Sequence, residues 1–168
     1  MELNSKFTEA HKKIGEAFQL CKNPAAAEKH YKAVVKLDPF NYKTIYKLGY
    51  MYLNDLKKPK QAVVMFEKCL DIDPSDADAK ISLALAFMEI DRIPVAITAF
   101  QELLVDSPED MVVRFNLGNA YLDTAAYSDA VAQYMVRCTL LSLYTQHQQM
   151  IFYSNIVPIL CLFQCRKY

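Results

Sequence analysis

The chain has 168 residues, of which 53% are hydrophobic and 23% are charged, so it is long enough and apolar enough to fold as a soluble domain with a buried core. It contains only three glycines, and this shortage of turn-forming residues disfavours a fold built from many short strands. Its formal net charge is zero, so no overall field attracts nucleic acid or an anionic membrane. We therefore expect no nucleic-acid partner, and we do not favour a membrane.

The cysteines and the first residues indicate the compartment. The five cysteines are odd in number and form no C-x-x-C motif, which is typical of reduced thiols inside a cell. Residues 1–20 carry charges where the apolar core of a secretory signal would lie. We expect a cytoplasmic protein, with the nucleus as the alternative location.

A repeating pattern runs along most of the chain. Pro39, Pro74 and Pro108 each follow an acidic residue or a serine, and they are separated by 35 and 34 residues. Alignment on these prolines gives a first column, in which a small residue precedes an aromatic one by three positions: Gly15 and Phe18, Gly49 and Tyr52, Ala84 and Phe87, Gly118 and Tyr121. In a second column an alanine precedes an aromatic residue by four positions: Ala27 and Tyr31, Ala62 and Phe66, Ala96 and Phe100, Ala130 and Tyr134.

These columns match the L-G-x-x-Y and A-x-x-x-F elements of a known repeat, so the chain resembles the tetratricopeptide repeat (TPR) family. The resemblance implies an all-α fold, namely an α-solenoid in which antiparallel helix pairs form a right-handed superhelix of about four units. In chain order the units span residues 8–41, 42–76, 77–110 and 111–142, and an irregular tail spans 143–168.

The residues within each unit predict two helices. Large apolar residues recur at steps of three and four, and Pro24, Pro59 and Pro94 lie near the start of the second helix, where proline is tolerated. The second unit has one additional residue, which we place in the polar turn 53–59. In the fourth unit the pattern stops after Tyr134, so its second helix is degenerate.

The tail is apolar and leaves three interpretations open. Its apolar run, residues 150–163, is shorter than the roughly 20 residues of a membrane-spanning helix and contains Ser, Asn and Pro. The tail is a cap that packs on the repeats, a weak membrane contact, or the translation of a retained intron, since the repeat pattern stops near Val136.

Motifs for catalysis and metal binding are absent from the sequence. His11, His30 and His147 lie far apart in the register of the repeat, and Cys21 with His30 lacks further ligands at zinc spacing. No glycine-rich phosphate loop and no hydrolase or metalloprotease motif occurs. We expect no enzymatic activity, no cofactor and no metal site.

In TPR proteins the first helix of each pair lines an inner groove, so the resemblance implies contacts from its second, fifth, sixth, ninth, twelfth and thirteenth positions. From these positions we select as candidate binding residues Lys12, Lys13, Lys43, Tyr46, Lys47, Tyr50, Ile81, Leu85, Met88, Phe115, Asn116 and Asn119. The lysines make one end of the groove basic, and the middle is apolar. We expect a protein partner that supplies an extended or helical peptide with apolar anchors. For each apolar residue, packing between repeats is the alternative.

Some TPR domains grip the C-terminal carboxylate of a chaperone with lysine, asparagine and arginine side chains. At the corresponding positions this sequence has Lys12, Glu16, Lys47, Asp78 and Ser82, of which only Lys12 matches, so a chaperone-tail receptor is disfavoured. The leading interpretation is an interaction module or scaffold. The alternatives are an accessory repeat domain of a larger enzyme, shortened here as an isoform, and a peripheral membrane adaptor held by its tail.

Truncation after residue 135 tests the tail. If the tail is an adventitious apolar extension, the shorter chain becomes more soluble and keeps the circular dichroism of its helices, because an exposed apolar segment is removed. If the shorter chain unfolds instead, the tail is a cap.

Overall fold

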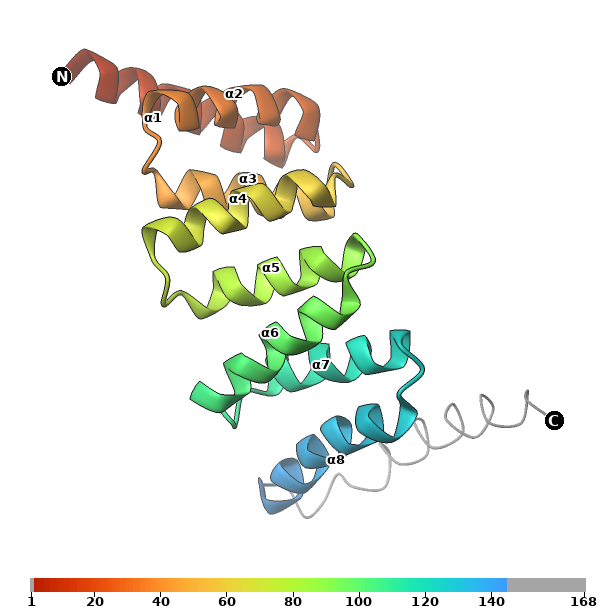
Figure 1. Cartoon of the computed structure of the whole chain (residues 1–168). Coiled ribbons are helices and arrows are strands. Elements are labelled where there is room, and N and C mark those ends of the chain that lie inside the picture. The colour runs from red at the N-terminus through yellow and green to blue at the C-terminus, as the bar shows by residue number, and fades with distance from the viewer. Residues whose placement is uncertain (1, 145–168) are drawn as a thin grey trace.

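The computed structural model describes residues 2–144, which form helices joined by short turns (Figure 1). The helices, in chain order, are α1 (Glu2–Leu20), α2 (Pro24–Leu37), α3 (Tyr42–Asn54), α4 (Pro59–Ile72), α5 (Ala77–Glu89), α6 (Ile93–Asp106), α7 (Met111–Asp123) and α8 (Tyr127–Tyr144). No strand occurs within residues 2–144, and the predicted all-α solenoid of repeats is confirmed. The predicted tail, residues 143–168, lies almost wholly outside the described residues.

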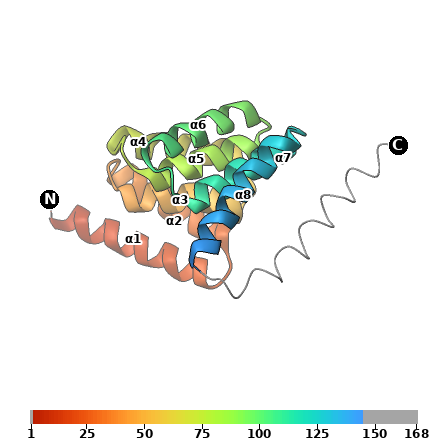
Figure 2. The same ribbon diagram turned by 90° about the horizontal axis from the view of Figure 1, so that it is seen from below.

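Consecutive helices pack on one another, so the array grows in one direction from α1 to α8 (Figure 1). The first helices of the pairs also touch their neighbours, since α3 contacts α5 and α5 contacts α7 (Figure 2). Helix α1 begins at Glu2, upstream of residue 8, where the repeat pattern begins, and it is longer than α3, α5 and α7. The array therefore has two different ends, with α1 at one and α8 at the other.

Local sequence signals explain where the helices begin. The side chains of Asn23, Asn41, Asp76 and Asp110 each accept a hydrogen bond from a backbone N–H in the first turn of the helix that follows. Proline occupies the first or second position of α2, α4 and α6, where its missing N–H costs no helical hydrogen bond. These local signals mark the residues at which α2 to α7 begin.

The turn within each pair uses a residue in the left-handed region. Lys22, Lys57, Asp91 and Ala125 have φ angles of 54°, 52°, 63° and 58°. In three of the turns a backbone hydrogen bond spans five residues, as from Asn23 to Phe18, whereas the corresponding bond in the second pair runs from Lys58 to Tyr52 and spans six. The prediction that the additional residue of the second unit lies in this turn is confirmed.

A small residue on the first helix and an aromatic ring on the second make the closest contact within each pair. A Cβ atom added to Gly15 would lie 2.7 Å from the ring of Tyr31, and one added to Gly118 would lie 2.5 Å from the ring of Tyr134. A Cβ atom on Gly49 would lie 2.9 Å from the ring of Phe66. Such separations are shorter than van der Waals contact, so these three rings fit only against glycine.

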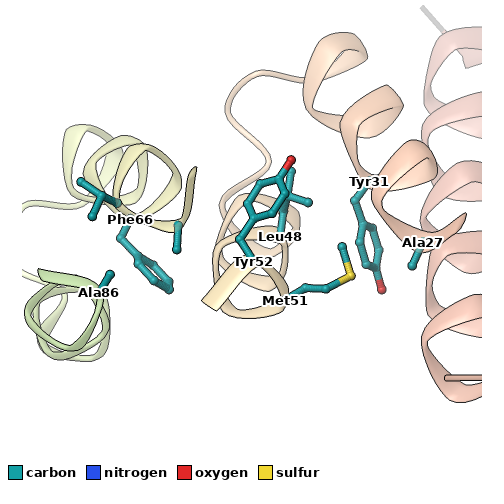
Figure 3. Close-up of a cluster of buried hydrophobic side chains, with 9 residues drawn as sticks. Ala27, Tyr31, Leu48, Met51, Tyr52, Phe66 and Ala86 are labelled. Atoms are coloured by element: carbon teal, nitrogen blue, oxygen red, sulfur yellow. The ribbon is translucent and has the colours of Figure 1, made fainter. Parts of the chain in front are cut away.

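The core continues from one repeat into the next. Tyr31, Met51 and Phe66 are fully buried in one cluster that joins α2, α3 and α4. Figure 3 shows Met51 pointing from α3 toward Tyr31 of α2, and Phe66 pointing from α4 toward Ala86 of α5. Each second helix therefore covers the first helix of the following pair as well as that of its own.

We expect Gly49→Ala to destabilise the protein by roughly 1–3 kcal/mol, because the added methyl group overlaps the Phe66 ring in a closely packed site. Urea unfolding followed by circular dichroism measures the change.

The control is the same substitution in a Phe66→Leu background. There the ring is absent, and the Met65 Cβ atom, 3.1 Å from the added atom, is the tight contact that remains. Because alanine is also a better helix former than glycine by roughly 1 kcal/mol, Gly49→Ala should cost clearly less than in the wild-type background. An equal loss of stability in both backgrounds would contradict the contact.

Candidate functional site

The first helices of neighbouring pairs meet through the register positions expected on the inner face. Lys47 Nζ on α3 lies 2.7 Å from Glu16 Oε1 on α1, and these residues occupy the sixth and ninth positions of their units. Tyr46 Oη on α3 lies 3.0 Å from Ser82 Oγ on α5, which joins a fifth and a sixth position. These positions therefore form a continuous surface across α1, α3 and α5.

The lysine end of this surface contains its own acidic partners. Lys12 Nζ lies 3.3 Å from a carboxylate oxygen of Glu9, and Lys13 Nζ lies 4.0 Å from the other. Lys43 is exposed, and no ion pair or hydrogen bond of its side chain occurs within the described part of the chain. The predicted basic end is therefore largely neutralised on α1, and Lys43 on α3 is its most available cation.

Glu16 is the acidic centre of this end, although it is absent from the predicted set. Its carboxylate accepts hydrogen bonds from Lys47 at 2.7 Å and from Lys13 at 3.3 Å. The hydrogen bond from Lys47 is the largest cause that holds the pKa of Glu16 below its ordinary value, and partial burial opposes it. The ion pair between Glu16 and Lys47 joins the first repeat to the second, so Lys47 has a structural partner.

The apolar middle of the surface combines packing with exposure. The Tyr46 ring packs edge-on against an aromatic ring of α4, and Ile81, Leu85 and Met88 pack against the buried cluster of α5, α6 and α7. All four side chains are half-buried, so they stabilise the repeats and still reach the surface. Tyr50, by contrast, is 52% exposed and belongs to no buried cluster of the described residues.

The fourth unit extends the surface onto α7. Phe115 is 43% exposed, and its ring lies 6.0 Å from that of Tyr134 on α8. Asn119 Oδ1 accepts a hydrogen bond of 2.7 Å from the Tyr134 hydroxyl, and Asn116 is half-buried. Val112, at the second position of the same unit, is 60% exposed and adds apolar area that the predicted set omits.

The aromatic residue of each second helix determines whether the first helix of the same pair presents a polar partner beside it. The hydroxyl of Tyr31 donates a 2.9 Å hydrogen bond to Gln19 on α1, much as the hydroxyl of Tyr134 donates to Asn119 on α7. Burial is the largest cause that raises the pKa of both hydroxyls. The two middle pairs have Phe66 and Phe100 instead, which lack a hydroxyl. The first helix therefore supplies a polar partner for the ring hydroxyl in α1 and α7, whereas α3 and α5 need none.

The two hollows that stand out on the described surface lie away from the predicted residues. One, of about 510 Å³, lies between α2 and α4 and is lined by residues such as Lys36, Phe40 and Ile72. The other, of about 360 Å³, lies where the turn before α4 meets the end of α5. None of the selected binding residues lines either hollow. The candidate site therefore coincides with neither hollow.

The structure corrects the prediction that the histidines lie far apart. His11 Nδ1 on α1 lies 3.0 Å from His30 Nδ1 on α2, because antiparallel pairing brings the two rings to the same level. The Phe18 ring stacks on His30. His147 lies outside the described residues. Among residues 6–135, whose side chains the structure describes, no three His, Cys, Asp or Glu side chains gather as a metal-binding group.

None of the helices in the described range combines the length and the apolar character that crossing a bilayer requires.

Comparisons with known proteins agree with this architecture. One tetratricopeptide repeat model matches residues 42–76, and a second matches residues 81–136. No curated protein matches the sequence.

Several solved structures share the fold. A structure of MamA protein is 27% identical, with a TM-score of 0.69 over 78% of this chain and 71% of that one. MamA 41-end from Desulfovibrio magneticus RS-1 is 22% identical, with a TM-score of 0.72 over 84% of this chain and 78% of that one. The second TPR domain of human RPAP3, in complex with the HSP70 peptide SGPTIEEVD, is 17% identical, with a TM-score of 0.61 over 70% of this chain and 97% of that one.

We expect Glu16→Gln to lower the free energy of unfolding at neutral pH by less than about 1 kcal/mol, because the ion pair with Lys47 is partly exposed to solvent. The folded-state pKa of Glu16 is depressed, so its contribution is present above the unfolded pKa of about 4.5 and is lost as the pH falls through the lower, folded value.

Urea unfolding at a series of pH values measures this difference between wild type and variant. The control is Glu102→Gln, which changes an exposed glutamate of α6 that has no ion pair within the described residues. A Glu16→Gln difference that stays constant between neutral pH and pH values well below 4.5 would contradict the assignment.

Proposed function

Since the chain belongs to the tetratricopeptide repeat family, we propose that it is a protein-interaction module whose inner face holds an extended or helical peptide of a partner protein. The proposal covers α1, α3, α5 and α7, whose residues at the contact positions form the surface described above.

The main support for this proposal is the exposure of large apolar side chains on this face. Tyr50, Phe115 and Val112 all lie at contact positions, and each of them keeps two-fifths or more of its surface in solvent. Exposed apolar groups gathered on one face are typical of binding surfaces, and aromatic side chains contribute most to the affinity of protein contacts. Half-buried Leu85 and Met88 extend the same apolar area on α5.

The partner peptide should therefore carry apolar anchors for the middle of the surface. Polar groups at its edge, such as Asn116 and Lys43, can bond to the peptide backbone or to an acidic side chain. The anchors would supply most of the affinity, and these polar groups would set the direction of the peptide.

A peptide held mainly by its C-terminal carboxylate is disfavoured. The RPAP3 domain is seen with a chaperone peptide, but here Lys47 pairs with Glu16, and Ser82 is buried against Tyr46. Asp78 adds a negative charge where a carboxylate would need a positive one. Binding a carboxylate at this point would require breaking the ion pair that joins the first two repeats.

The test selects a peptide from a displayed library against the full chain and then measures its affinity by fluorescence anisotropy. Tyr50→Ser with Phe115→Ser should weaken binding by about thirtyfold or more, since such anchors contribute about 2 kcal/mol. Leu85 is left unchanged, because it packs against the buried cluster and its loss would also weaken the fold.

The matched control is Val105→Ser with Tyr127→Ser, which removes exposed apolar side chains from α6 and α8. Circular dichroism should be unchanged in both double variants. Binding that survives Tyr50→Ser with Phe115→Ser, but is lost when the four selected lysines are changed to glutamate, would overturn the apolar-surface proposal.

A further inference from the structure

The first helix of each pair has three register positions on the side that faces the preceding pair. The third, seventh and tenth positions are Thr44, Leu48 and Met51 in α3, Ala79, Leu83 and Ala86 in α5, and Val113, Leu117 and Ala120 in α7. All nine side chains are buried except that of Leu83, which is half-buried. In α3, α5 and α7 these positions are therefore part of the core.

The second helix of the preceding pair is what covers them. Met51 lies against Tyr31 of α2, and Ala86 lies against Phe66 of α4 (Figure 3). Val113 of α7 shares a buried cluster with Leu103 of α6. The same type of interface thus recurs at α2–α3, α4–α5 and α6–α7.

On α1, no other helix of the described residues covers the same three positions. They are Ala10, Ile14 and Ala17, and all three are exposed, with Ile14 at 41%. The row extends one turn further with Phe7, which is 59% exposed. These residues are spaced at alternating steps of three and four, which puts them on one stripe of the helix. The end repeats of such arrays normally present a polar outer face, so this stripe has the character of an interface and not of a cap.

We propose that the outer face of α1, formed by Ala10, Ile14 and Ala17, binds an amphipathic α-helix of a partner protein in the way that α2 packs on α3. The occupant continues an interface that the chain already builds three times. It is distinct from the peptide held on the inner face, because the third, seventh and tenth positions are not those that line that face.

The covering helices define the chemistry of the occupant. Each has apolar residues on one face over about two turns, such as Ala27, Tyr31 and Val34 in α2 or Ala96, Phe100 and Leu103 in α6. A second copy of this chain is less suited, because the sequence of α8 has Arg137 at the register of Val34 and Leu103. The occupant is therefore a helix with a three-residue apolar stripe from another protein.

The chain's own α6 supplies the probe. A capped, fluorescently labelled peptide with the sequence of residues 93–106 should bind the full-length protein saturably, as measured by anisotropy, and should gain helical circular dichroism when it binds. Ala17→Glu places a charge in the centre of the stripe and should weaken this binding at least about tenfold. Because Ala17 is exposed, the fold should be unchanged.

The matched control is Ala132→Glu, the same change at an exposed alanine of α8, which should bind the peptide as wild type does. A peptide of the same composition in scrambled order should not bind. Absence of saturable binding up to millimolar peptide would overturn the proposal. So would binding that is insensitive to Ala17→Glu but lost with Tyr50→Ser and Phe115→Ser, since the peptide would then occupy the inner face. Sedimentation showing a wild-type dimer that Ala17→Glu converts to monomer would also overturn it, because a second copy would cover the stripe.

Discussion

The close approach of a small residue on the first helix to an aromatic ring on the second is the contact on which the array depends. Gly15, Gly49 and Gly118 leave no room for a Cβ atom beside the rings of Tyr31, Phe66 and Tyr134. In the third pair, Ala84 and Phe100 share one buried cluster, so a methyl group is accommodated there. Because the same ring also reaches the next pair, as Phe66 reaches Ala86, this contact sets both the spacing within a pair and the stacking between pairs.

The chemistry of the inner face follows from the same ring. Where the ring is tyrosine, its buried hydroxyl needs a partner, and Gln19 or Asn119 supplies one from the first helix. Where it is phenylalanine, the neighbouring positions need no polar partner, and Ile81, Leu85 and Met88 of α5 occupy this side of the array. The choice of aromatic residue in the core thus determines where the first helix must supply a polar partner.

The junction between the first two pairs depends more on polar contacts than the others do. Consecutive helices pack least extensively at α2–α3, and the carboxylate of Glu28 lies beside this junction. It accepts hydrogen bonds from Lys58 at 2.9 Å and from the Tyr52 hydroxyl at 3.2 Å, as well as from Lys32. Burial by itself raises the pKa of Glu28, but these partners outweigh it and the pKa is lowered. With the Glu16–Lys47 pair on the inner face, the first repeat is held by charges on both sides.

Proline and the glycine–aromatic columns act locally and recur at fixed spacing, so the chain alone predicts the repeat, the all-α fold and the turn that holds the additional residue. The register positions of the inner face are implied by the resemblance to the family, and their role in binding stays a prediction. What those side chains do depends on contacts between helices that are far apart in the sequence. Lys47 pairs with Glu16 across 31 positions, and His11 meets His30 across 19. Tyr46 and Leu85 are partly used in packing, whereas Tyr50 is left exposed. Ile14 and Leu48 occupy the same position of the repeat, yet Ile14 is exposed and Leu48 is buried. Burial at this position depends on whether a neighbouring helix covers it. The sequence of a single helix does not contain that information.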